Sequence, residues 1–329
     1  MTQRHHVIAV GNALVDVIAT AEPAFLVSHG IAKGSMRLIP ADEAEALYAA
    51  MGAGREISGG SAANTVAGMA ALGARTLFVG RVADDQLGRV FAHDIRAAGV
   101  DFATPPSTGG TPTGRCLIVV TPDGDRTMNT FLGACQELSE ADLDPVAVAA
   151  ADILYLEGYL WDPPAPRAAM RKAIEVARAN HTKVALTLSD VFCVEGYRAD
   201  FRALLASHVD LVFGNEHEVC ALYQTKDLDT AMAELARHSC TAVITRSAAG
   251  AVVIEGGRHH VVAAEPAARV LDTTGAGDLF AGGFMAAMVE GRSLPDCARV
   301  GCIAAAEIIS HYGARPEVDL QALVKARLG

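Results

Sequence analysis

The sequence is poor in lysine and has no cysteine pattern typical of metal sites or disulfides. Only five of its 27 basic residues are lysines, and the net charge is −11. No Lys/Arg run is present, so a nucleic-acid-binding surface is not expected. The seven cysteines are odd in number and lack C-x-x-C spacing, which predicts reduced, mostly buried thiols in a cytoplasmic protein.

Long apolar runs are also missing, so no membrane partner is expected. The amino-terminal segment superficially resembles a signal peptide, because basic Arg4 precedes an apolar stretch. Gly11, Asn12 and Asp16 interrupt that stretch, which therefore predicts a buried first strand and not a secretory segment.

Two common nucleotide-binding loops are absent as well. No G-K-[ST] occurs, which excludes a P-loop. The stretch Gly275-Ala-Gly277 continues as Asp-Leu-Phe and therefore fails the dinucleotide-binding fingerprint. A nucleotide would have to be held by a different arrangement of amides and charged groups.

The chain does contain a regular alternation of apolar strands and helical segments. This alternation predicts one α/β domain over residues 1–329, with a mainly parallel central sheet flanked by helices. The predicted strands are 7–10, 76–79, 153–156, 184–188, 209–213 and 242–245. The predicted helices are 61–72, 86–98, about 165–180, 197–206 and 227–238, 276–290 and 294–310.

Two β-rich segments, Ile31–Ile39 and Thr111–Leu132, interrupt this alternation. The second contains Pro122-Asp-Gly between β-rich runs, which is a hairpin signal. We expect the two segments to pair, so that about 12–47 and 101–135 form a small β subdomain. It is either a lid over the active site, which we favour, or an edge extension of the main sheet.

The most informative stretch runs from Asp272 to Phe284, at the start of a predicted helix. Gly275, Ala276 and Gly277 leave free backbone N–H groups at the positive end of the helix dipole, which together form a seat for phosphate. A carboxylate beside that seat binds phosphate poorly, so we infer that Asp278 takes a proton from an attacking hydroxyl. The simpler alternative is an acid that only stabilises its helix.

A second stretch, Ser58-Gly-Gly-Ser-Ala-Ala-Asn64, opens another helix after a glycine pair. The glycines permit close approach of a ligand to the backbone. Asp16 offers a carboxylate suited to vicinal sugar hydroxyls. The alternatives are a serine-capped turn and an acid that caps a strand end. The candidate sugar-binding residues are Asn12, Asp16, Gly59, Gly60, Ser61 and Asn64.

The two stretches, with their continuations, resemble the two signatures of the PfkB (ribokinase-like) carbohydrate kinases, in the expected order. Gly11–Asp16 and the hairpin from Thr113 to Arg126 resemble the adenosine kinase branch. Asn215-Glu-His-Glu218 resembles the N-x-x-E motif that positions magnesium and phosphate. The similarity covers about residues 7–315, and it implies a ribokinase-like fold with a small β lid.

The resemblance also implies roles for individual residues. Asp278 would be the general base, and the amides of Gly275, Ala276 and Gly277 would stabilise the transferring phosphoryl group. Arg126 would lie over the phosphates, and Asn215 and Glu218 would hold the water shell of Mg²⁺. Asp272 and Thr274 are candidates for a monovalent-cation site, such as K⁺. Residues implied near ATP are Asn215, Glu218, Thr245, Arg246, Gly250, Thr273, Gly275, Gly277, Ile309 and Gly313.

The implied reaction moves the γ-phosphoryl of ATP to the 5′-hydroxyl of a ribonucleoside, adenosine in the first place. The base would enter a slot formed by Leu14, Cys116, Leu132, Tyr159 and Trp161. The stretches 158–161 and 187–190 depart from the adenosine kinase pattern, so the acceptor stays open. A free-sugar kinase of ribokinase or fructokinase type is the alternative, and a non-catalytic sugar or nucleotide sensor is a remote one. We expect a monomer or homodimer.

Overall fold

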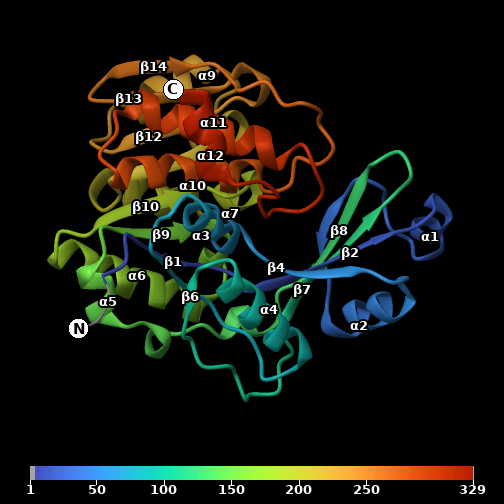
Figure 1. Cartoon of the computed structure of the whole chain (residues 1–329). Helices are drawn as coiled ribbons and strands as arrows, with labels where there is room; N and C mark the ends of the chain where they lie inside the picture. Colours follow the sequence, from blue (N-terminus) through green and yellow to red (C-terminus); the bar gives the residue numbers. More distant parts are fainter. Residues whose placement is uncertain (1–3, 329) are drawn as a thin grey trace.

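The computed structural model describes residues 4–328, and within them the larger of two sheets has nine strands (Figure 1). Their order is β14-β13-β12-β11-β10-β9-β1-β5-β6. Strands from β12 to β6 in this order are parallel, and β13 and β14 complete the sheet in antiparallel pairing. The strands are β1 (Val7–Val10), β5 (Thr76–Val79), β6 (Asp101–Phe102), β9 (Ile153–Glu157), β10 (Lys183–Thr187), β11 (Leu211–Asn215), β12 (Thr241–Thr245), β13 (Ala251–Glu255) and β14 (Arg258–Val262).

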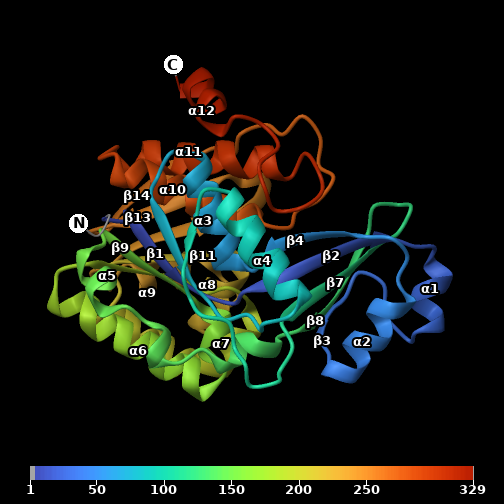
Figure 2. The ribbon, with the colours of Figure 1, turned by 60° about the horizontal axis from the view of Figure 1, so that its bottom comes forward.

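Helices cover both faces of this sheet, because the side chains of its buried strands alternate between two apolar clusters (Figure 2). In β1, Val7 and Ala9 belong to one cluster, whereas Ile8 and Val10 belong to the other. The first face carries α3 (Ser61–Ala71), α4 (Gln86–Ala97), α10 (Ala276–Val289), α11 (Leu294–Ile308) and α12 (Leu320–Leu328). The second carries α5 (Pro145–Ala150), α6 (Pro164–Ala179), α7 (Val191–Ser207), α8 (Glu216–Leu222) and α9 (Leu228–Leu235).

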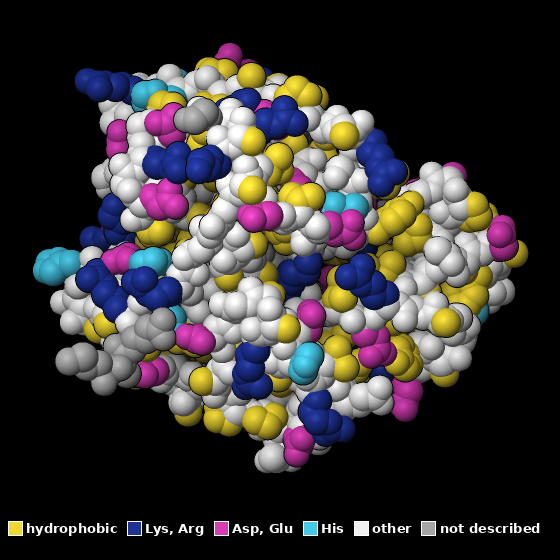
Figure 3. Space-filling view, viewed as in Figure 1, with side chains coloured by type: hydrophobic (Ala, Val, Ile, Leu, Met, Phe, Trp, Pro, Cys, Tyr) yellow, Lys and Arg dark blue, Asp and Glu magenta, His cyan; other side chains and the backbone are white. Residues whose placement is uncertain are grey.

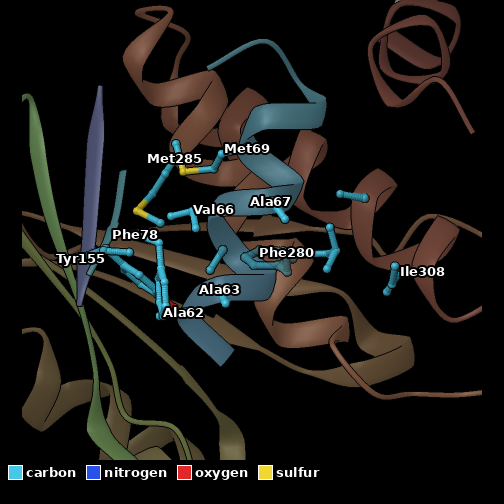
Figure 4. Close-up of a cluster of buried hydrophobic side chains, with 14 of the residues drawn as sticks. Ala62, Ala63, Val66, Ala67, Met69, Phe78, Tyr155, Phe280, Met285 and Ile308 are labelled. Atoms are coloured by element: carbon cyan, nitrogen blue, oxygen red, sulfur yellow. The ribbon is translucent and has the colours of Figure 1, made fainter. Parts of the chain in front are cut away.

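The tightest packing on the first face joins α10 to its neighbours α3 and α11. A Cβ on Gly282 would lie 2.6 Å from the Thr65 carbonyl oxygen of α3, and one on Gly283 would lie 2.9 Å from the Val300 carbonyl oxygen of α11. The glycine pair after Asp278 therefore brings three helix backbones together. Figure 4 shows the resulting cluster, in which side chains of α3 meet Phe280 of α10 and Tyr155 of β9.

A second sheet projects from the side of the first and, within residues 4–328, has five strands in the order β3-β8-β7-β2-β4 (Figures 1 and 2). The pairs β2–β7 and β3–β8 are parallel, and β2–β4 and β7–β8 are antiparallel. Two helices, α1 (Pro23–Ser28) and α2 (Ala41–Ala50), accompany this sheet. Its strands are β2 (Leu14–Thr20), β3 (Met36–Leu38), β4 (Arg55–Gly59), β7 (Gly114–Val120) and β8 (Arg126–Phe131).

The predicted α/β class with a mainly parallel sheet is confirmed, and the boundaries of the small sheet need correction. The segment 31–39 does pair with 126–131, through β3 and β8. However, Arg55–Gly59 also joins this sheet, although we predicted no strand there. Asp101–Phe102 lies instead at the edge of the larger sheet. The hairpin β13–β14 was likewise missed.

Four short 3₁₀ helices connect these elements within the described part of the chain. They are η1 (Gly133–Glu137), η2 (Glu140–Asp142), η3 (Gly158–Trp161) and η4 (Ser247–Ala249). Among residues 4–328, no helix has both the length and the apolar character required to cross a membrane. On the face shown in Figure 3, basic and acidic side chains are interspersed and form no continuous basic patch.

Candidate active site

A cavity of about 690 Å³ opens where the two sheets meet. It lies at the carboxyl ends of β1, β9, β10, β11 and β12. The strand order of the sheet reverses at β1, which has β5 as its neighbour on one side and β9 on the other. Such switch points of parallel sheets are where ligands bind. The predicted site residues that line it are Asn12, Leu14, Asp16, Gly60, Ser61, Asn64, Cys116, Leu132, Tyr159, Asn215, Glu218, Thr245, Thr273, Thr274, Gly275, Ala276, Gly277 and Asp278.

Asp278, in the first turn of α10, is held by two side chains of α3. Ser61 Oγ donates to Asp278 Oδ1 at 2.6 Å, and Asn64 Nδ2 donates to Asp278 Oδ2 at 2.9 Å. Burial raises the pKa of Asp278, while the bonds from Ser61 and Asn64 oppose that rise. The result is an oriented carboxylate with increased proton affinity, as a general base requires.

The predicted anion seat is the turn that opens α10. Gly275 has φ 76°, and a Cβ there would lie 2.7 Å from Ala314 Cβ, so glycine is needed at this position. The Ala276 N–H donates to the Thr273 carbonyl at 3.2 Å and is used within the turn. Gly277 lines the cavity, and its N–H is among the first-turn donors that have no partner inside a helix. The seat therefore depends more on Gly277 than on Ala276.

Asp16 lies on β2, across the cavity from the α10 turn. The residue is 8% exposed, and burial raises the pKa of its carboxyl to about 6, against the opposing charges of Arg315 and Arg126. A Cβ on Gly59 would overlap the Asp16 carboxylate, so Gly59 leaves room for the acid and does not itself line the cavity. Among the described hydrogen bonds none ends on the Asp16 side chain, which leaves both oxygens available to a ligand.

The second sheet supplies an apolar wall beside Asp16. The predicted Leu14, Cys116 and Leu132 belong to it, and burial raises the pKa of the Cys116 thiol to about 12, which keeps it neutral. Sequence reasoning missed four more apolar members of this wall, because their strands were not assigned to one face. These are Met36, Leu38, Ile118 and Met128.

The two aromatic residues predicted for the base slot have different positions. Tyr159 lines the cavity, with its ring 5.8 Å from that of Phe192. Trp161 does not, and that prediction is wrong. Its side chain is fully buried against Phe201, and its indole Nε1 donates to Asp200 Oδ2 at 2.8 Å. The 3₁₀ turn η3 rotates Trp161 into the core beneath α7.

Asn215 and Glu218 form a capping box at the start of α8. Asn215 Oδ1 accepts from the Glu218 N–H at 2.9 Å, and the Asn215 N–H donates to Glu218 Oε2 at 3.0 Å. Burial raises the pKa of Glu218 to about 7. Asn215 Nδ2 also donates to Glu218 Oε1 at 2.6 Å, so each carboxylate oxygen already accepts one hydrogen bond. Both residues line the cavity, and a magnesium ion there would be held through water and not directly.

The Asp272 carboxylate, predicted with Thr274 to hold a monovalent cation, has three partners in the structure. The Asp272 carboxylate accepts from the N–H groups of Thr274, at 2.9 Å, and Gly313, at 3.0 Å. It is also paired with the guanidinium of Arg126, which reaches across from β8. The Arg126 guanidinium thus neutralises Asp272 in this structure, and the monovalent-cation site stays a prediction. Arg126 itself does not line the cavity, although it pairs with Asp272 and interacts electrostatically with Asp16.

The residues predicted near ATP divide into two groups. Thr245 and Thr273 line the cavity together with the α10 turn. Outside the lining, Arg246 pairs with Glu216 at 3.0 Å, and Gly250 closes the β12–β13 hairpin at φ 84°. Ile309 and Gly313 also lie outside it, and their backbone groups bind the segment from Leu271 to Asp272.

Two charged residues near Asp278 were not predicted. Glu157, at the end of β9, is fully buried and lines the cavity floor. Arg315 follows α11 and donates to Asn64 Oδ1. A carboxylate directly after the apolar run Ile153–Leu156 was a signal that could have found Glu157, because ligands meet parallel sheets at strand ends. No local signal marks Arg315.

A family model described as "pfkB family carbohydrate kinase" matches residues 24–320. The chain belongs to the PfkB family of carbohydrate kinases. It is similar to adenosine kinase 2 of Arabidopsis thaliana, with 27% identity over 330 residues that cover 93% of this chain and 94% of the relative. As a member of this family it is a phosphotransferase with an alcohol group as acceptor, and the family implies ATP as the donor.

Two solved structures share the fold, and one of them is an adenosine kinase. Adenosine kinase from Sinorhizobium meliloti is 49% identical with a TM-score of 0.92, over 99% of this chain and 100% of that one. A probable sugar kinase protein from Rhizobium etli is 46% identical, also with a TM-score of 0.92, over 99% of both chains. The predicted PfkB family, its adenosine kinase-like branch and the ribokinase-like fold are confirmed, and the acceptor is a nucleoside or a sugar.

Proposed function

We propose that this PfkB kinase phosphorylates the 5′-hydroxyl of adenosine, producing AMP and ADP from adenosine and ATP. One observation carries the proposal: the Asp16 carboxylate, suited to a ribose diol, adjoins an apolar wall built by the second sheet. A free sugar carries hydroxyls around its ring and would leave that wall without a matching surface. A nucleobase has flat apolar faces, and its burial in such a slot contributes about 1–3 kcal/mol.

The proposed reaction uses each side of the cavity. Asp16 and Asn12 hold the ribose, so that its primary hydroxyl faces Asp278. Asp278 takes the proton of that hydroxyl as its oxygen attacks the γ-phosphorus of ATP and the bond to the β-phosphate oxygen breaks. The N–H groups of the α10 turn and Arg126 stabilise the charge on the transferring phosphoryl group.

Magnesium completes the proposal, because it neutralises phosphate charge during transfer. Glu218, with Asn215 beside it, would hold its water shell, because both residues line the cavity at the end of β11. The chain has no P-loop lysine, so the phosphate charge has to be met by Arg126, the α10 amides and this ion.

The test is ADP release with purified protein and a panel of nucleosides and free sugars. We expect kcat/KM for adenosine to be at least about tenfold above that for ribose or fructose. The similarity to the probable sugar kinase of Rhizobium etli makes a free-sugar kinase the second candidate. A pentose or hexose that outperforms every nucleoside would decide for that candidate and leave the family assignment in place.

A charged substitution in the wall sharpens the test. Met128→Asp places a carboxylate against the proposed base, whereas it does not touch the sugar-binding side. For a nucleoside kinase KM should rise at least about tenfold, because an unpaired charge is costly in an apolar slot. Lys325→Met, on the exposed α12, is the control variant.

A further inference from the structure

We propose that Arg315 is a positioning residue, which sets the orientation of the Asn64 side-chain amide and thereby fixes Asp278 for proton removal. The inference rests on the proposed role of Asp278 as general base. Arg315 lies outside the cavity lining, in the segment between α11 and α12, so its action on the reaction is indirect.

The guanidinium of Arg315 joins two elements of the active site, α3 and β4. One terminal nitrogen donates to Asn64 Oδ1 of α3. The other donates to the carbonyl oxygen of Ser58, at 2.7 Å, and to Ser58 Oγ, at 2.8 Å, at the end of β4. Such a fork of donors in one plane is available only to arginine.

The chemistry of the amide makes this contact directional. A guanidinium only donates, so the Asn64 amide must turn its oxygen toward Arg315. Its Nδ2 then faces Asp278 and donates to Oδ2 at 2.9 Å. With the amide reversed, its oxygen would face the Asp278 carboxylate and the donor would be lost. Arg315 therefore selects the orientation that supports the base.

The far end of the network is fixed by Asp94 of α4. Asp94 Oδ2 accepts from the Ser58 N–H at 2.7 Å and from Ser58 Oγ at 2.6 Å. Because the Ser58 hydroxyl has a single hydrogen, which goes to Asp94, its oxygen is left to accept from Arg315. Donation thus runs outward from Arg315 in two directions. One passes through the Asn64 amide to Asp278, and the other passes through the Ser58 hydroxyl to Asp94.

Arg315 also has an electrostatic effect on Asp278. Its positive charge opposes the rise in the pKa of Asp278 that burial causes. The other titratable groups that interact with Asp278 carry no positive charge, so they do not share this task, and the Asp278 carboxylate raises the pKa of each of them. They are Asp16 on β2, Tyr155 and Glu157 on β9, Tyr159 on η3 and Glu218 on α8.

Two substitutions of Arg315 separate the effect of its planar set of donors, the fork, from the effect of its positive charge. Arg315→Met removes both, and we expect kcat to fall roughly 10- to 100-fold, because a misplaced reacting group costs about that much. The acid limb of the pH profile of kcat should also move up by about one pH unit, because an opposite charge has been removed from Asp278. Arg315→Lys keeps the charge and loses the fork, so the acid limb should stay while kcat falls.

The control is Arg292→Met, an exposed arginine that pairs with Glu290 between α10 and α11. It should leave kcat, KM and the pH profile as in the wild type. A merely structural role for Arg315 would lower the melting temperature and kcat without moving the acid limb, and that result would overturn the proposal. If Arg315→Met does not fold, the test rests on Arg315→Lys. A wild-type kcat of Arg315→Lys at every pH would refute the role of the fork.

Asp278→Asn, measured in the same series, separates this inference from the proposed function. If Asp278→Asn stays active, the assignment of the base fails, and the role of Arg315 fails with it. If Asp278→Asn is inactive while Arg315→Met keeps the wild-type profile, the inference alone is wrong. We expect Asp278→Asn to be inactive and Arg315→Met to have a lower kcat with a shifted acid limb.

Discussion

Glu157 and Asn12, which are 145 residues apart in the chain, are joined by one carboxylate oxygen at the floor of the cavity. Glu157 Oε1 accepts from the Asn12 backbone N–H at 2.7 Å and from its side-chain Nδ2 at 2.5 Å. The second oxygen accepts from the Ala62 N–H at 2.8 Å. The end of β9 thus holds both the loop after β1 and the start of α3, which carry the proposed sugar-binding residues.

This contact makes a prediction about stability and pH. Burial raises the pKa of Glu157 to about 7, above its ordinary value of 4.5. A group with a raised folded-state pKa contributes stability below its unfolded pKa and loses that contribution as pH rises through the folded pKa. The contribution of Glu157 to the free energy of unfolding should therefore fall as the pH rises from about 4.5 to about 7.

Glu157→Gln removes this titration but keeps an acceptor for Asn12. The melting temperature of the wild type, relative to that of Glu157→Gln, should fall as pH rises across this window. Thermal unfolding of both proteins at several pH values measures the difference. Parallel melting curves across the window would mean that Glu157 keeps an ordinary pKa despite its burial.

Asp278→Asn is expected to fold and to bind ATP, because asparagine can still accept from Ser61 and has nearly the same shape. The kcat should fall roughly 10²–10⁴-fold, which is the usual contribution of a positioned general base. Steady-state ADP release and ATP binding by calorimetry provide the two measurements. A variant that keeps more than about a tenth of wild-type kcat would remove Asp278 from this role.

Asp16→Ala separates substrate binding from stability. Losing a charged hydrogen-bond partner of the ribose should raise KM for the nucleoside by an amount equivalent to about 1.5–3 kcal/mol, with KM for ATP nearly unchanged. Because burial raises the pKa of Asp16 to about 6, its ionised form destabilises the folded protein above that pH. The variant should therefore melt at a higher temperature than the wild type at neutral pH.

The matched control for this variant is Asp42→Ala, which removes an exposed acid from the first turn of α2 in the same subdomain. It should change neither KM. Equal losses of affinity for ATP and nucleoside in Asp16→Ala would indicate damage to the fold and not a lost ribose contact.

Local sequence signals located the strands and helices that bear the α10 turn and the start of α3. They succeeded because apolar periodicity and glycine-rich turns are properties of neighbouring residues. The contacts of Glu157 with Asn12 and of Arg315 with Asn64 join distant segments, and no local pattern encodes them. The prediction for Trp161 failed for a related reason. The 3₁₀ turn η3 follows strand β9 and turns the Trp161 side chain away from the cavity.

The lid hypothesis predicts that ligand binding orders the second sheet. In the structure the only described ion pair linking this sheet to the α10 turn region is Arg126 with Asp272, and Arg315 adds hydrogen bonds to Ser58 at the end of β4. Adenosine would add contacts to Asp16 and to the apolar wall, and closure would exclude water from phosphoryl transfer. Residues 31–39 and 113–131 should then gain protection from hydrogen exchange.

Hydrogen exchange followed by mass spectrometry, with and without saturating adenosine, measures this protection. Peptides from β14, on the far edge of the larger sheet, serve as the internal control and should not change. Arg126→Ala should lower the protection of 113–131 with and without adenosine, because its pair with Asp272 links β8 to the α10 turn region in the structure without ligand. If saturation leaves the exchange of both segments unchanged in the wild type, the second sheet is a rigid wall of the site and not a lid.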